Sequence, residues 1–68
     1  MKFCDKRIAR ILKSGGKITK PRWGDRQWFD LSDNGNIRHF VVQEDNIYFE
    51  YPILSFSEIF GEEWMEVK

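Results

Sequence analysis

The chain has a single cysteine, a single histidine and only two prolines in 68 residues. One cysteine cannot form a disulfide within the chain. A single unpaired cysteine is typical of a protein kept in a reducing cytoplasm. Cys4 and His39 are also the only soft metal ligands, whereas a structural zinc site needs four ligands, so we expect neither a metal nor a cofactor. No apolar run is long enough to span a membrane, and the charged N-terminal segment lacks the apolar core of a signal peptide.

The chain also lacks net charge, but this neutrality conceals two opposite halves. Residues 1–26 hold nine Lys or Arg against two acids, a balance of +7, and residues 27–68 hold nine acids against two bases, a balance of −7. A bipolar protein can offer a basic site to an anion, or its two ends can dock on copies of itself. We expect the basic face of the N-terminal segment and the acidic C-terminal segment to meet between subunits.

Aromatic residues are abundant, with six Phe, three Trp and two Tyr. A domain of this size buries only about 60% of the surface that its unfolded chain exposes. With no disulfide or metal expected, self-association remains as a source of added stability. Aromatic side chains are enriched in interfaces, although they could also simply fill a small core. We therefore predict one small domain over residues 1–68 that forms a homo-oligomer.

The spacing of apolar residues predicts an α+β fold. Residues 3–14 have the periodicity of an amphipathic helix whose apolar stripe consists of Cys4, Ile8, Ile11 and Leu12. After Gly15-Gly16 the period becomes two, which predicts strands over residues 17–20, 26–32, 37–43, 47–51 and 62–67. A helical turn at residues 55–60 is expected before the last strand. Together these elements predict an N-terminal helix packed on a twisted four- to five-stranded antiparallel sheet.

The sequence shows no arrangement typical of an enzyme. Cys4 and His39 could form a nucleophile–base pair, but Cys4 falls on the predicted apolar stripe and no third group orients the pair. Glu62 and Glu63 are neighbours, so on a strand they point to opposite faces and cannot act as an acid–base dyad. Residues 15–17 lack the spacing of a phosphate-binding loop. We expect a protein without catalytic activity.

The segment from Lys17 to Trp28 interleaves basic residues with two tryptophans. Flat aromatic faces beside cations suit a ligand that carries phosphates and a base. The alternative interpretation is that both tryptophans anchor the core and the bases form a solvated face. A long nucleic acid is a poor candidate, because it needs a continuous basic surface and the acidic half would repel it. We predict a small anionic ligand bound by Lys20, Arg22, Trp23, Arg26 and Trp28.

Both ends of the chain resemble one known family. Residues 8–23 form an amphipathic segment with leucine, lysine, serine and two glycines, followed by a β-branched residue, basic residues and a tryptophan. Residues 55–67 place a short turn before two acids, a tryptophan, an acid and a valine. These patterns resemble the second Thoeris anti-defence family of small phage proteins. Lys20 and Trp23 fall on matching positions, whereas Pro21 and Arg22 depart from the family pattern and the middle of the chain is shorter.

The resemblance implies a non-catalytic phage protein that acts in the cytoplasm of the infected bacterial host. Members of the family resemble molecular sponges: they form homo-oligomers and sequester nucleotide-derived signals of defence systems such as Thoeris or CBASS. A cyclic ADP-ribose isomer or a cyclic oligonucleotide is therefore the expected ligand. The alternative is a direct inhibitor of a bacterial defence or host enzyme, comparable to an anti-CRISPR protein. In that case an acidic surface of this chain would occupy a basic cleft of the enzyme. The acidic surface would consist of Glu58, Glu62, Glu63 and Glu66.

Overall fold

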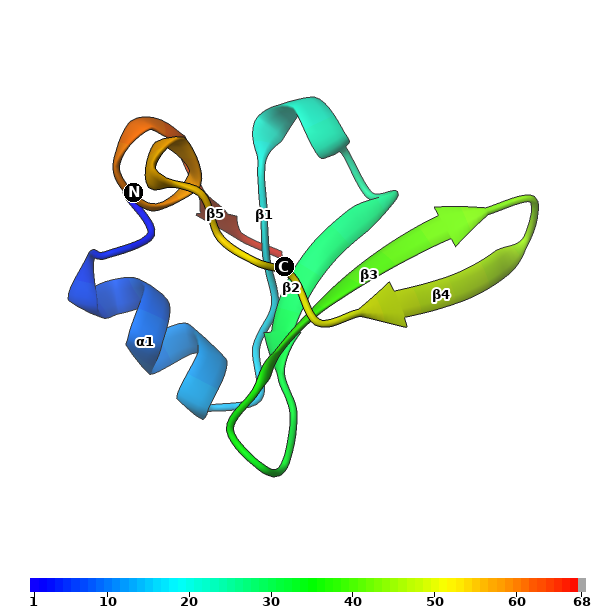
Figure 1. Cartoon of the computed structure of the whole chain (residues 1–68), viewed down its shortest axis with the longest axis horizontal. Helices are drawn as coiled ribbons and strands as arrows, with labels where there is room; N and C mark the ends of the chain where they lie inside the picture. The colour runs from blue at the N-terminus through cyan, green and yellow to red at the C-terminus, as the bar shows by residue number, and fades with distance from the viewer. Residues whose placement is uncertain (68) are drawn as a thin grey trace.

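The computed structural model describes residues 1–67 and confirms the predicted α+β fold, with one N-terminal helix and a five-stranded antiparallel sheet (Figure 1). The sheet has the strand order β4-β3-β2-β1-β5, so β4 and β5 are its two edges. A 3-10 turn, η1, and a π-helical turn, η2, complete the fold. In chain order the elements are α1 (Lys6–Lys13), β1 (Ile18–Thr19), η1 (Pro21–Trp23), β2 (Gln27–Leu31), β3 (Ile37–Gln43), β4 (Asn46–Glu50), η2 (Ser57–Gly61) and β5 (Met65–Glu66).

Helix α1 begins three residues later than predicted. Asp5 is its N-cap and accepts a hydrogen bond from the backbone N–H of Arg7 at 2.8 Å, which satisfies one of the unpaired donors of the first turn. Cys4 therefore precedes the helix and is exposed, so its predicted place on the apolar stripe is wrong. Phe3 packs inward instead, with its ring centroid 5.5 Å from that of Trp64.

The core lies between α1, the central strands and the C-terminal segment. It consists of five buried apolar side chains: Ile8, Leu12, Ile18, Phe29 and Trp64. Burying a large aliphatic or aromatic side chain stabilises the fold by about 1.5–3 kcal/mol. Because the core has only five such side chains, each one supplies a large share of the stability. Within residues 1–67, no helix is long and apolar enough to cross a membrane.

Three predicted strands are shorter than expected, β2 by one residue at each end, and η1 was not predicted. β1 ends at Thr19 because Pro21 starts the 3-10 turn, where a missing N–H is tolerated. β5 comprises only Met65–Glu66 and pairs with β1, while residues 62–64 of the predicted strand lie outside the sheet. The N-terminus lies alongside this segment, since the backbone N–H of Trp64 donates to the carbonyl of Met1 at 2.7 Å.

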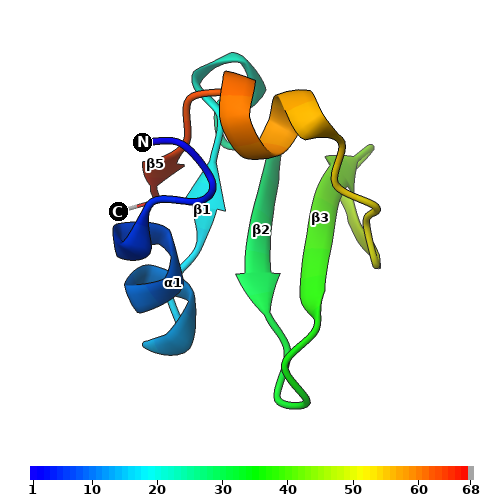
Figure 2. The ribbon, with the colours of Figure 1, turned by 60° about the vertical axis from the view of Figure 1, so that its left-hand side comes forward.

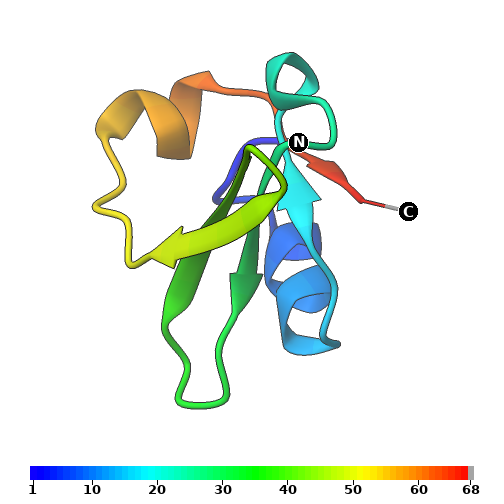
Figure 3. The same ribbon diagram turned by 90° about the vertical axis from the view of Figure 1, so that its right-hand side faces the viewer.

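The two faces of the sheet have different surroundings. Side chains alternate along β2, as predicted, so that Phe29 and Trp28 point to opposite sides. α1 and η2 both cover the face that carries Phe29 (Figure 2). The opposite face, which we call the open face, carries Trp28 and its cross-strand partner Phe40. The β3–β4 hairpin extends away from α1 (Figures 1 and 3).

Candidate functional site

The structure divides the five predicted ligand residues between two places. Lys20, Arg22 and Trp23 gather around η1, on the side of the sheet that is packed. Trp28 lies in β2 and points to the open face, whereas Arg26 lies in the bend just before the strand, where its carbonyl accepts a hydrogen bond from the backbone N–H of Val42 at 2.8 Å. The two groups therefore have different surroundings.

Lys20 is a buried cation. Its side chain is 4% exposed, and its ammonium Nζ lies 3.7 Å from a carboxylate oxygen of Glu58 and 3.9 Å from one of Glu62. The same atom lies 4.7 Å from the ring centroid of Trp23 and 5.0 Å from that of Trp64. Carboxylates and indole faces both stabilise a cation that has lost its water. The charge of Lys20 is thus balanced within the chain.

Trp23 packs against the core on several sides. Its ring stacks on the imidazole of His39, with centroids 4.9 Å apart and an angle of 15° between the planes. It also meets Trp64 edge-on at 5.5 Å and Phe29 in a tilted arrangement at 5.6 Å. Contacts of this kind are typical of an aromatic anchor. Arg22, in contrast, is exposed, and its guanidinium forms an ion pair with Glu62 at 3.1 Å.

The acidic C-terminal segment pairs with basic groups of its own chain. In addition to the pairs that Glu62 makes, Glu63 lies 2.8 Å from the N-terminal amine and 3.2 Å from the ammonium of Lys2. Hydrogen bonds from these two groups lower the pKa of Glu63. Within one chain, these acids already have basic partners, so opposite charges meet inside the subunit as well as, in our prediction, between subunits. The reason is topological, because Met1 and Trp64 exchange backbone hydrogen bonds that bring the two ends of the chain together. Glu62 and Glu63 lie before β5 and not in a strand as predicted, and their carboxylates pair with different basic groups.

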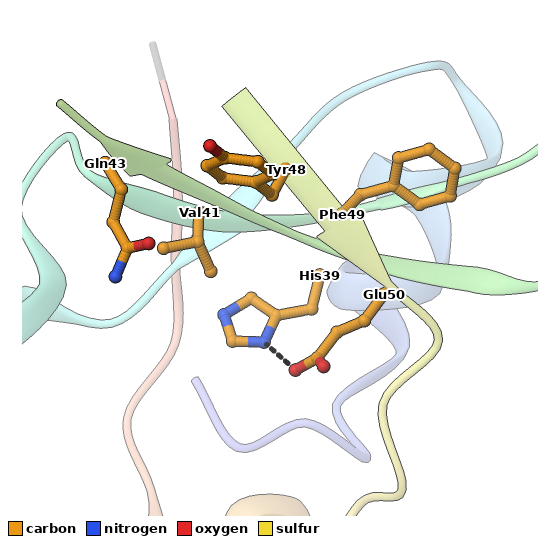
Figure 4. A pocket seen from close by; sticks show the side chains of 6 residues that line it. All are labelled: His39, Val41, Gln43, Tyr48, Phe49 and Glu50. Carbon is orange, nitrogen blue, oxygen red and sulfur yellow. Dashed lines mark ion pairs between the residues drawn. The ribbon is translucent and has the colours of Figure 1, made fainter. Parts of the chain in front are cut away.

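A shallow hollow of about 240 Å³ lies on the packed side of the β3–β4 hairpin. In Figure 4 the ring of His39 faces the carboxylate of Glu50, with Nδ1 and Oε1 3.6 Å apart. Burial lowers the pKa of His39 even though Glu50 and Glu58 favour its charged form. The carboxylate of Glu50 repels an anion, and a neutral imidazole has no positive charge to offset this. The hollow is therefore a poor site for a phosphate.

The open face carries a ladder of aromatic rings that crosses three strands. Trp28 and Phe40 stack with centroids 5.5 Å apart and an angle of 11° between their planes. Phe49 on β4 continues the ladder at 5.3 Å from Phe40. Sequence reasoning identified Trp28 but missed Phe40 and Phe49. The alternation within residues 37–43 and 47–51, read together with the hairpin register, could have identified them.

Cations border this ladder. Nζ of Lys17 lies 4.9 Å from the ring centroid of Trp28, and the guanidinium of Arg38 lies 5.1 Å from that of Phe40. Arg38 also forms two hydrogen bonds of 2.8 Å with the carboxylate of Asp30. Arg26 and Lys17 form no ion pair with any residue from 1 to 67. The ammonium of Lys17 therefore lies against the ladder and is available to an anionic ligand.

The basic part of the open face is small. Arg26 lines a second hollow together with three acids. Asp25 lies just before the start of β2, and Glu44 and Asp45 form the β3–β4 turn. These acids would repel the phosphates of a long nucleic acid that continued past Arg26. The geometry suits a compact anion better than a polyanion. Comparisons of the chain with family models, curated proteins and solved structures found no match.

Proposed function

We propose that this chain is a non-catalytic phage anti-defence protein that binds a nucleotide-derived immune signal on the open face of its sheet. One observation carries this assignment: the stacked pair of Trp28 and Phe40 lies beside the ammonium of Lys17 on a face that α1 and η2 leave uncovered. A base would stack on the rings, and phosphates would reach Lys17 and Arg26. The resemblance of both chain ends to the second Thoeris anti-defence family supports the same class of ligand.

The mechanism would be sequestration in the cytoplasm of the infected bacterial host. The ligand, a cyclic ADP-ribose isomer or a cyclic oligonucleotide, would be held without being changed. Stacking on an aromatic side chain contributes about 1–3 kcal/mol per base, and each hydrogen bond to a charged group about 1.5–3 kcal/mol. One stack and two such bonds give roughly 4–9 kcal/mol before the cost of association, whereas micromolar binding needs about 8 kcal/mol net. Sequestration therefore favours a homo-oligomer, which can direct more contacts to one ligand.

Isothermal titration calorimetry against a panel of cyclic nucleotides and cyclic ADP-ribose isomers tests this function. The wild-type protein is expected to bind at least one of them with a Kd of about 10 µM or lower. Trp28→Ala is expected to weaken this binding about 5- to 150-fold, the equivalent of one lost stack. Phe56→Ala is the matched control, because it removes an exposed aromatic ring from the packed side of the molecule.

Two results would overturn this assignment. No binding of any panel member at tens of micromolar would exclude nucleotide sequestration at useful affinity. Binding that is lost in Arg22→Ala and retained in Trp28→Ala would move the site to η1.

Direct inhibition of a host enzyme through the acidic half is less well supported. Glu58, Glu62 and Glu63 already have basic partners within the chain, so little of their charge is available to a basic cleft. Capture of one stoichiometric defence protein from bacterial lysate, lost on charge reversal at Glu66, would favour this alternative.

A further inference from the structure

We infer that β4 is a dimerisation edge, at which β4 of one copy pairs antiparallel with β4 of a second copy about a two-fold axis through Tyr48. β4 is the edge strand remote from α1 (Figures 1 and 3). Ile47, Tyr48 and Phe49 are 61%, 55% and 52% exposed, and they alternate between both faces of the sheet. An exposed apolar edge of this length is a template for another strand.

The hairpin turn determines which backbone groups of β4 are available. Glu44 and Asp45 have φ angles of 49° and 68°, which is the conformation of a two-residue type I′ turn. In such a hairpin the pair that flanks the turn exchanges hydrogen bonds, and hydrogen-bonded pairs then alternate with non-bonded pairs. The N–H and C=O groups of Tyr48 consequently point to β3, and those of Ile47 and Phe49 point to the free edge.

A two-fold axis through Tyr48 satisfies these groups and matches the side chains. It places Ile47 opposite Phe49 of the second copy, and Phe49 opposite Ile47, so that both pairs exchange backbone hydrogen bonds. It also places Glu50 opposite the amide of Asn46, so that no acid faces an acid.

Neighbouring registers are worse. An axis through Ile47 brings Glu44 opposite Glu50. An axis through Phe49 leaves only one hydrogen-bonded pair within β4, because the strand ends at Glu50. The register through Tyr48 is therefore the one in which both hydrogen bonding and charge are satisfied.

The apolar area available suggests a reversible dimer. Four large apolar side chains on or next to β4 are more than half exposed: Ile47, Tyr48, Phe49 and Tyr51. Since an aromatic side chain buries about 150–250 Å² in full, these supply roughly 100 Å² each and roughly 800 Å² for two copies. Stable interfaces bury about 1,200–2,000 Å², so this edge reaches the lower bound only when its backbone is added. The contact is isologous and uses the edge up, so growth stops at two copies.

Pairing of this kind would join the two open faces. Residues opposite each other in an antiparallel pair project from the same face of the sheet. The ladders that end at Phe49 in each copy would thus become continuous across the dimer. Formation of the dimer does not depend on nucleotide binding, so the two can be tested separately.

Cysteine cross-linking tests the register, in a Cys4→Ser background because Cys4 is an exposed thiol. Tyr48→Cys puts two thiols opposite each other at a non-hydrogen-bonded pair, where Cα atoms lie about 4.5 Å apart and a disulfide can form. Asn46→Cys is the matched control on the same face of the same strand, because it would lie opposite Glu50. We expect a reducible dimer from Tyr48→Cys that forms at least about tenfold faster than from Asn46→Cys.

Sedimentation velocity tests the edge itself. Ile47→Pro removes an outward N–H and leaves the hydrogen bonds to β3 intact, so it is expected to give a folded monomer. Ile53→Pro is the control, since Ile53 is 96% exposed and lies outside the strand. A wild-type protein that stays monomeric at about 100 µM, or equal cross-linking at both cysteine positions, would overturn the inference. A dimer that binds no nucleotide would count only against the proposed function.

Discussion

Replacing Lys20 by methionine removes the buried ammonium that joins β1, η1 and the C-terminal segment. Deleting one member of a buried ion pair costs about 3–5 kcal/mol, because the remaining charge is left without a partner. Glu58 and Glu62 are still 26% and 27% exposed, so water can take over part of their solvation and we expect a loss of about 3 kcal/mol. A domain of this length has a free energy of unfolding of about 3–10 kcal/mol, so the variant should lie close to the limit of folding.

Urea unfolding followed by tryptophan fluorescence measures this loss as a lower midpoint at an unchanged slope. Lys17→Met is the matched control, since Lys17 is exposed and its removal should change stability by about 0.5 kcal/mol or less. Combining Lys20→Met with Glu58→Gln should cost less than the sum of the two single changes. A loss below about 0.5 kcal/mol for Lys20→Met would refute the structural role of the ammonium and make Lys20 available again as a ligand residue.

Three further changes probe the core, the end of the helix and the titration of the imidazole. Trp64→Ala is expected to cost about 3–5 kcal/mol and to abolish most of the native circular dichroism signal; a fully folded variant would contradict the assigned core. Gly16→Ala would place a Cβ 2.8 Å from Cγ2 of Ile11 and 2.9 Å from its carbonyl oxygen, so we expect a loss of about 1–3 kcal/mol in urea unfolding, and an unchanged midpoint would contradict it. Since burial lowers the pKa of His39, the unfolded chain binds the proton more readily, and stability should fall as the pH drops below about 6.5. Thermal unfolding of His39→Gln should lose that part of the pH dependence, and a slope equal to that of the wild type would show that another group titrates.

Local patterns were sufficient to predict most of the fold. The alternation along β2 and β3 distinguishes their two faces, and Asn34-Gly35 predicts the turn between them, where Gly35 has a φ of 88°. These features depend on neighbouring residues only. α1 starts three residues later than the apolar periodicity indicates, because Asp5 caps the helix and periodicity alone does not identify a capping residue.

The candidate site depends on contacts between distant residues, and it was predicted only in part. Lys20 looks like a ligand residue in its local context, but it is buried against Glu58 and Glu62, about forty positions away. Likewise, the ladder on the open face needs the register of two hairpins, which brings Phe40 and Phe49 beside Trp28. Composition and spacing give the residue types of such a site, whereas the pairing of strands decides which of them meet.

Native mass spectrometry of protein purified from bacteria with an active nucleotide-signalling defence would examine binding and assembly together. For the wild type we expect dimers that carry the additional mass of a nucleotide. Trp28→Ala should keep the assembly and lose that mass, because the indole belongs to the open face and not to β4. Wild-type protein with only the mass of its own chain, from cells that contain the signal, would contradict nucleotide sequestration by the open face.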